Sequence, residues 1–433
     1  MELGETSAPA TPEPRDHREE QKKHVKIRLS VFFDGTLNNR VNTDHREQNT
    51  AVYQANKVKK MDNSYENDHT NVEKIERYME TSEDKDYDKK LSIYIEGPGT
   101  EDEKSDARRG YGLGTGATGI EAKVLRGIVK SIETMTGHVE TNSIIDKLTL
   151  DVFGFSRGAA GARNYIFAAL KEDDSIRDGM ESKKRPIKTI EIHFAGLFDT
   201  VASHGAIPLL LGLPNTKSLK LDSIRKAKKV IHLVAADEHR ENFALTNIKS
   251  AGSKGREIYL PGVHSDIGGG YRDEASEAMV IYKTLRAENA AAERHRLIAA
   301  GWYRPDEITL QHIPPKIGLA SVHLRVTRSG IRHHYSRIPL HIMARFARES
   351  DIDIDSELES DEDIPDALSA IQERIEAYIS SIGTTSTETD WQQNDGILRQ
   401  LRHDYYHFSA NYSPGMKPRF NDNGQRKRMH YAG

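Results

Sequence analysis

Short apolar runs recur along the first two thirds of the chain, with longer amphipathic stretches between them. The first run, KIRLSVFF at 26–33, combines β-branched and aromatic side chains, as expected of a buried strand. Similar runs predict strands at 91–97, 148–155, 190–198, 229–236 and, more weakly, 256–263. Helical periodicity covers 119–136 and 159–171. This alternation predicts an α/β fold, a mostly parallel sheet with helices on both faces.

Beyond residue 275 the strand pattern fades, and helical patterns cover 274–300, 337–349, 366–382 and 395–411. We therefore expect a catalytic body at 25–275 and a smaller, mainly helical C-terminal region at 276–433. Residues 350–364 are acidic and poorly periodic, which predicts an exposed linker. Residues 1–24 are charged and rich in proline, which predicts a disordered arm.

The composition limits the partners and the catalytic groups that can be expected of this chain. Lys and Arg number 62 against 66 Asp and Glu, a net charge of −4, so nucleic acid is not an expected partner. The chain has no cysteine, which excludes disulfides, thiolate metal sites and a cysteine nucleophile. The N-terminus lacks the apolar core of a secretory signal, and no apolar run approaches the length of a membrane span. We expect synthesis in the cytoplasm without a cleaved signal peptide.

The clearest local motif is Gly154-Phe155-Ser156-Arg157-Gly158, placed where a predicted strand ends and a helix of small residues begins. This is the context that G-x-S-x-G requires, because the serine must stand on a sharp strand-to-helix turn. The flanking glycines allow the close approach of strand and helix. Ser156 is therefore the candidate nucleophile, and the backbone N–H of Arg157 at the helix start is a candidate oxyanion donor.

A serine hydroxyl needs a base, and in α/β-hydrolases the partners follow in the order Ser, acid, His. Asp199 closes the strand after the nucleophile, and His264 precedes a run of glycines. Asp199 and His264 are the preferred acid and base. Other candidates stay open: Asp237 or Asp266 as the acid, and His239 as the base.

Two further segments lie near these residues in the chain. Phe33-Asp34-Gly35-Thr36-Leu37 is similar to the haloacid-dehalogenase signature, but phenylalanine at position 32 replaces its nucleophile. A loop that lends the amide of Gly35 or Thr36 as a second oxyanion donor is the preferred interpretation. After Asp199, the run GAIPLLLGLP contains Leu209, Leu210 and Leu211, which are candidates for membrane and acyl-chain contact.

Six blocks in order give a family resemblance over residues 25–275. They are FFDGTLNN at 32–39, the glycine loop at 110–119, GFSRGA at 154–159, FDTV at 198–201, DEHR at 237–240 and GVHSDIGG at 262–269. Together they resemble the first family of type VI secretion lipase effectors.

The resemblance implies an α/β-hydrolase whose triad falls on Ser156, Asp199 and His264. Members are phospholipases A that a contractile apparatus injects into rival bacteria, where they attack membrane lipid from the periplasmic side. It also implies a cognate immunity protein and a secretion spike or adaptor as carrier. The alternatives are a soluble carboxylesterase or thioesterase without a membrane role, and a non-catalytic adaptor on a hydrolase scaffold.

We expect no cofactor. Residues 114–119 fit G-x-G-x-x-G, but the preceding predicted strand ends too far upstream for a dinucleotide-binding turn. Asp351, Asp353, Asp355 and Glu362 have the spacing of calcium ligands in an EF-hand loop. Serine replaces the required glycine at position 356, so a solvated acidic linker is the preferred interpretation and no metal is expected.

Overall fold

The computed structural model describes residues 22–57, 64–203, 216–315, 320–383, 391 and 396–433. Its centre is a six-stranded sheet in the order β2-β1-β3-β4-β5-β7, and every neighbouring pair is parallel. The strands are β1 His24–Phe33, β2 Lys89–Ile95, β3 Ile144–Phe155, β4 Ile187–Phe198, β5 Lys229–Ala235 and β7 Gly255–Leu260. The predicted α/β class and all six predicted strands are confirmed.

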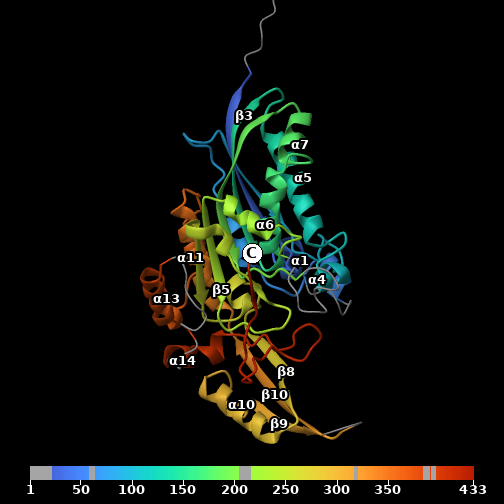
Figure 1. Ribbon diagram of the computed structural model, residues 1–433, viewed down its shortest axis with the longest axis vertical. Helices are drawn as coiled ribbons and strands as arrows, with labels where there is room; N and C mark the ends of the chain where they lie inside the picture. The colour runs from blue at the N-terminus through green and yellow to red at the C-terminus, as the bar shows by residue number, and fades with distance from the viewer. Residues whose placement is uncertain (1–21, 58–63, 204–215, 316–319, 384–390, 392–395) are drawn as a thin grey trace, which may run out of the picture.

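Helices cover both faces of the sheet (Figure 1). Figure 1 shows α5 Ile120–His138, α6 Arg157–Leu170 and α7 Ile176–Ser182 on one side, and α11 Arg337–Arg348 on the other, where α3 Asn71–Arg77 also packs. Successive residues of a strand point to opposite faces, so Phe33 packs under α5 and α6 while Phe32 joins the core beneath α11. Two hydrophobic cores therefore hold the sheet from both sides.

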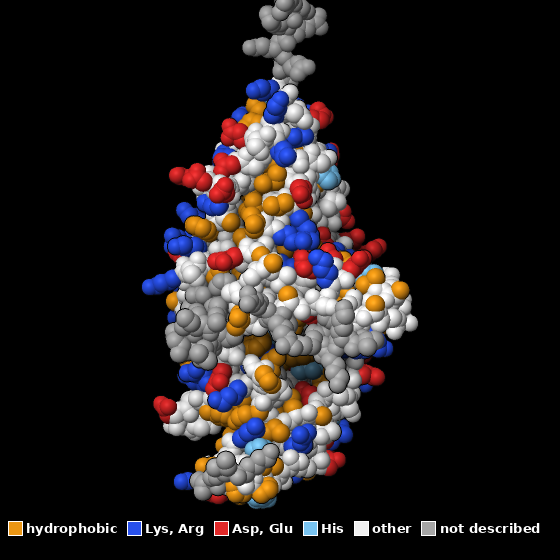
Figure 2. Space-filling model, turned by 90° about the vertical axis from the view of Figure 1, so that its right-hand side faces the viewer, with side chains coloured by type: hydrophobic (Ala, Val, Ile, Leu, Met, Phe, Trp, Pro, Cys, Tyr) orange, Lys and Arg blue, Asp and Glu red, His pale blue; other side chains and the backbone are white. Residues whose placement is uncertain are grey.

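The outer surface of the α5–α6 layer is partly apolar. Leu125 and Val129 of α5 and Phe167 of α6 are 64%, 43% and 40% exposed. Figure 2 shows hydrophobic side chains scattered among charged ones on this side of the molecule. No helix in the described part of the chain is both long enough and apolar enough to cross a bilayer.

The C-terminal region contains the expected helices and also a sheet that the sequence pattern did not predict. Strands β8 Ala275–Thr284, β10 Ser321–Ile331 and β9 Ile308–Ile313 form an antiparallel sheet in that order. The helix predicted at 274–300 is thus wrong in its first part, and only α10 Ala287–Ala299 is helical. β8 pairs with β10, which lies beyond α10 and β9 in the chain, and this long-range partner overrides its local periodicity.

Further helices of the described chain include α1 Arg40–Glu47, α2 Ala51–Lys57, α4 Arg108–Leu113, α9 His264–Gly268, α12 Glu357–Asp361, α13 Ser369–Ser381 and α14 Gly396–Tyr405. The acidic segment 350–364 is not an exposed linker. Its apolar residues Ile352, Ile354 and Leu358 are buried, and Ile354 forms a β-bridge with Met79. Alternate apolar residues anchor this segment to the body.

The end of the chain returns to the body. Strand β11 His430–Tyr431 pairs in parallel with β6 Leu245–Thr246, and Figure 1 shows the tail running up to the middle of the molecule. The division of the chain at residue 275 stays a prediction.

Candidate active site

The strand order reverses direction between β1 and β3. After β1 the chain moves outward to β2, and after β3 it moves to β4 on the other side. In open α/β sheets, ligands bind at the carboxyl ends of the strands where the order reverses in this way. Gly35 and Thr36 follow β1, and Ser156 follows β3, so the topology places these predicted site residues together.

Ser156 stands on a strained turn. Its φ of 58° and ψ of −126° lie in a region that residues with a side chain rarely adopt. A Cβ on Gly154 would lie 2.6 Å from Cα of Ala159, and one on Gly158 would lie 2.1 Å from the carbonyl oxygen of Asp34. Both glycines are therefore required by close backbone approach, as the motif predicted.

Asp199 follows β4, is fully buried and also has a positive φ, 42°. Oδ1 accepts hydrogen bonds from the Ala235 amide at 3.0 Å and from Arg428 Nη1 at 2.6 Å. Oδ2 accepts from Arg428 Nη2 at 2.8 Å and lies 2.5 Å from His264 Nδ1. A bidentate arginine and an imidazole thus hold this carboxylate on both oxygens.

Burial and neighbouring charged groups shift the pKa values of Asp199 and His264. Burial would raise the pKa of Asp199, but Arg428 and the hydrogen bond with His264 outweigh it and hold that pKa well below its usual range. Burial lowers the pKa of His264, although Asp199 opposes the change. A neutral imidazole beside an ionised carboxylate is the state in which histidine accepts a proton.

His264 begins α9 His264–Gly268 and is 4% exposed. Its ring lies between two phenylalanines, with centroid distances of 4.6 Å to Phe155 and 5.0 Å to Phe243. Phe155 directly precedes Ser156, so His264 lies beside the turn that carries the serine. Within the described residues the Ser156 hydroxyl makes no hydrogen bond. In unliganded enzymes this contact is often long and shortens when substrate binds.

The alternative acids and base have other partners. His239 has both ring nitrogens engaged, Nδ1 with the Asp237 carbonyl at 2.8 Å and Nε2 with Arg426 at 2.9 Å. Burial lowers the pKa of His239 to about 3. The Asp237 carboxylate accepts from the Gly262 amide at 2.8 Å. These contacts favour structural roles for His239 and Asp237.

Asp266 braces the loop that carries His264. Its carboxylate accepts from the Val263 amide at 2.9 Å and lies 2.8 Å from Nδ1 of His407, a residue of the C-terminal segment. Asp266 therefore links the candidate base to the end of the chain and does not pair with His264.

The loop after β1 has the position expected of an oxyanion loop, but one of its two predicted amide donors is already hydrogen-bonded. The Gly35 amide donates to the Asp34 carboxylate at 2.6 Å, so it is engaged. The amides of Thr36 and Arg157 make no hydrogen bond within the described chain. Asp34 also accepts from Tyr94 at 2.5 Å. Burial raises the pKa of Asp34 to about 6, although the hydrogen bonds from Tyr94 and the Gly35 amide oppose this change. Of the two β1-loop donors predicted, the contacts favour Thr36.

The remaining predicted site residues are three leucines and four calcium candidates. Leu209, Leu210 and Leu211 lie outside the described residues. Among the calcium candidates, Asp353 pairs with Lys90 at 2.5 Å, and Glu362 pairs with Lys74 and Arg337 at 2.8 and 3.0 Å. Asp351 and Asp355 belong to the segment that packs on the body, where the Asp355 amide donates to the Tyr78 carbonyl. Carboxylates paired with cations do not favour a calcium loop.

Arg428 is the residue of this site that sequence reasoning missed. The local sequence KPRFNDNGQRKR shows only a basic tail. Nothing in that composition distinguishes Arg428 from Lys427, which is exposed, whereas Arg428 is 3% exposed. The pairing of β11 with β6 brings the tail to Asp199, where Arg428 forms its two hydrogen bonds.

The family model of the type VI secretion phospholipase effector Tle1-like catalytic domain matches residues 168–292. This match confirms the resemblance to the type VI secretion lipase effectors. The matched range includes Asp199 and His264 and begins after Ser156. It supports a hydrolase of the secreted phospholipase effector kind.

Comparison with solved structures shows which fold the chain shares. The structure of the Tle1 effector bound to the VgrG spike from the type VI secretion system aligns over 98% of this chain and 99% of that chain, with a TM-score of 0.64 and 22% identity. The two chains therefore share a fold. An uncharacterized protein from Pseudomonas aeruginosa aligns over 89% of this chain and 53% of its own, with a TM-score of 0.38 and 19% identity. No curated protein matches the chain.

Proposed function

We propose that this chain is a serine esterase that hydrolyses acyl esters of membrane phospholipids, a phospholipase A delivered to rival bacteria by type VI secretion. The observation that carries the proposal is the arrangement of Ser156, Asp199 and His264 at the carboxyl edge of the sheet, in a chain with a Tle1-like match. A nucleophile on a strained turn beside a carboxylate-bound histidine suits acyl transfer.

The reaction follows from these contacts. His264 binds Asp199 through Nδ1, which leaves Nε2 to take the proton of Ser156 as its hydroxyl attacks the ester carbonyl. The resulting imidazolium protonates the lysophospholipid oxygen as the ester bond breaks. Water, activated by His264, then releases the acyl chain from Ser156 as a fatty acid. Asp199 stays ionised throughout and stabilises the imidazolium.

The negative charge of the tetrahedral intermediate needs backbone donors. We assign this role to the amides of Arg157 and Thr36, which make no hydrogen bond within the described chain and follow the carboxyl ends of β3 and β1. Asp34 holds the Thr36 loop in place through Tyr94 and the Gly35 amide.

The type VI secretion apparatus is the proposed route of delivery. The match to a Tle1 structure solved with its VgrG spike supports a spike partner for this chain. The family resemblance adds a cognate immunity protein and action at the periplasmic face of the target membrane. The immunity protein and the periplasmic site of action are proposed on the family resemblance.

Product analysis tests the reaction class. A phospholipid with different acyl chains at sn-1 and sn-2 is incubated with the protein in isotopically labelled water, and the products are read by mass spectrometry. We expect one lysophospholipid and one free fatty acid that carries the label, which also assigns the acyl position. Release of a phosphorylated headgroup, or no turnover, would contradict the proposal.

The apolar run after Asp199 is proposed to contact the bilayer. Replacing Leu209, Leu210 and Leu211 by glutamine should lower hydrolysis of phospholipid vesicles by roughly tenfold or more, because burying one leucine contributes about 1.5–3 kcal/mol. Hydrolysis of a short soluble ester should stay within roughly twofold. Leu125→Gln, at an exposed leucine of α5, is the control. Equal losses on both substrates would contradict membrane contact.

A further inference from the structure

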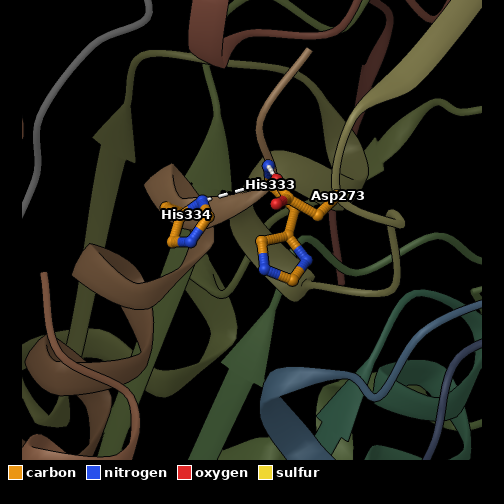
Figure 3. A group of neighbouring side chains, drawn as sticks. All are labelled: Asp273, His333 and His334. Carbon is orange, nitrogen blue, oxygen red and sulfur yellow. Dashed lines mark hydrogen bonds and ion pairs between the residues drawn. The ribbon is translucent and has the colours of Figure 1, made fainter. Parts of the chain in front are cut away.

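Asp273, His333 and His334 form a cluster outside the candidate active site. Each offers one ligand atom, and these atoms lie within 4.8 Å of one another. Figure 3 shows the Asp273 carboxylate pointing toward the two histidines. Asp273 lies between α9 and β8, and the histidines directly precede α11. Two imidazoles and a carboxylate are a donor set suited to a transition metal.

His333 is oriented for ligation. Its Nδ1 lies 3.1 Å from the Tyr271 carbonyl oxygen and 3.3 Å from the Asp68 carboxylate. A carbonyl acceptor places the proton on Nδ1 and leaves the lone pair on Nε2. Metal-binding histidines commonly hold their second nitrogen against a carbonyl or carboxylate in this way.

His334 supplies a second donor nitrogen. Its Nδ1 is buried and makes no hydrogen bond within the described residues, and it forms only a long ion-pair contact with Asp273 Oδ1 at 3.5 Å. A distance of 3.5 Å is too long for a good hydrogen bond. A cation between Asp273 and His334 would satisfy both groups.

We propose that Asp273, His333 and His334 bind a divalent transition-metal ion, with Zn²⁺ the best match. Imidazole nitrogen with one carboxylate suits zinc, whereas calcium and magnesium prefer a shell of oxygen ligands. Water completes a tetrahedral site.

The site would join segments that meet behind the candidate base. Asp68 donates its amide to the Gly270 carbonyl, and Asn71 donates to the carbonyls of Ile267 and Ser336 at 2.9 Å each. An ion held by Asp273 and the two histidines would therefore fasten the segment after His264 to the start of α11. Its role would be structural, because it stabilises the loop that carries the base.

A second cluster of Asp44, Glu47 and His69 provides an internal comparison. It has a single imidazole, and His69 Nδ1 lies 3.3 Å from the buried Glu73 carboxylate. With one nitrogen donor it is a poorer zinc site. This cluster allows the two locations to be separated by mutation.

The test measures metal binding directly. The untagged full-length protein is treated with a chelator, dialysed and titrated with Zn²⁺ by calorimetry and with Co²⁺ by visible absorption. We expect one ion per chain, a Co²⁺ absorption band, and a rise in Tm with Zn²⁺ that Mg²⁺ does not reproduce. Absence of Zn²⁺ binding by the wild-type protein would overturn the proposal.

Single substitutions test which residues bind the ion. His334→Gln and Asp273→Asn should each weaken Zn²⁺ binding by roughly tenfold or more and remove the rise in Tm. His323→Gln, on β10, should bind as the wild type does. Asp273 is exposed, so its amide variant does not threaten the fold, which circular dichroism checks. Undiminished binding in both variants, or loss only in His69→Gln, would show that the site is elsewhere.

Discussion

Ser156→Ala is expected to abolish phospholipid hydrolysis. Without the hydroxyl no acyl-enzyme forms, and the remaining groups only bind substrate and stabilise charge. Loss of a serine nucleophile typically lowers kcat by roughly 10⁴-fold or more. The fold should survive, because alanine is smaller than serine and the strain at this turn arises from the backbone. The measurement is fatty-acid release from vesicles, with Tm and circular dichroism as checks on folding.

Ser182→Ala is the matched control for this change. Ser182 ends α7 and its hydroxyl donates only to the Gly179 carbonyl in the described chain. Its loss should leave hydrolysis unchanged within roughly twofold. If Ser156→Ala retained full lipid turnover, serine esterase chemistry at this site would be excluded, and a non-catalytic scaffold role would be favoured.

Arg428→Met is expected to cause the second largest loss. Arg428 donates to both oxygens of Asp199, and its side chain is 2% exposed while that of Asp199 is fully buried. Removing one partner of a buried ion pair costs about 3–5 kcal/mol, because the other charge stays buried. Asp199 would then shift relative to His264, and a misplacement of about 1 Å can lower the rate roughly 100-fold.

The pH dependence distinguishes this role from general destabilisation. Arg428 offsets the charge of Asp199, so it favours the neutral form of His264. Without it, the imidazolium is stabilised more strongly and the pKa of His264 rises. Because the reaction needs neutral His264, the acid limb of kcat/KM should shift to higher pH. The other charged groups that face His264, Glu238 and Arg240, are unchanged and pair with each other at 2.7 Å.

Two variants complete this experiment. Arg428→Lys keeps the charge and loses the bidentate geometry, so it should restore the position of the acid limb more than it restores kcat. Lys427→Met, at the exposed neighbouring residue, should leave the profile unchanged. An Arg428→Met protein that loses stability but keeps the acid limb of the wild type would reduce Arg428 to a purely structural role.

The features predicted correctly depend on short stretches of chain. Strand β3, the turn at Ser156 and helix α6 are specified by residues 148–171, because a run of apolar residues, two glycines and a helix of small residues each act over a few positions. The residues that follow each strand are then expected at a common edge, because parallel strands present their carboxyl ends at one edge of the sheet. This rule makes Asp199 and His264 candidates, and they lie 2.5 Å apart, while their catalytic roles stay a prediction.

Predictions failed where pairing is long-range. β8 was expected to be helical because its partner β10 is distant in the chain. The acidic segment 350–364 was expected to be a linker because its charge hides three buried apolar residues. In both segments, packing against another element outweighs local propensity and composition.

Arg428 shows the difference between what local sequence specifies and what only tertiary packing decides. The order of strands, turns and glycines along the chain specifies the sheet, the strained Ser156 turn and the edge where Asp199 and His264 emerge. The partner of Asp199 is decided only when a tail 229 residues away folds back and pairs through β11 with β6. Charge compensation of a buried carboxylate depends on distance in space, and a basic tail carries no local signal that says which of its cations becomes buried.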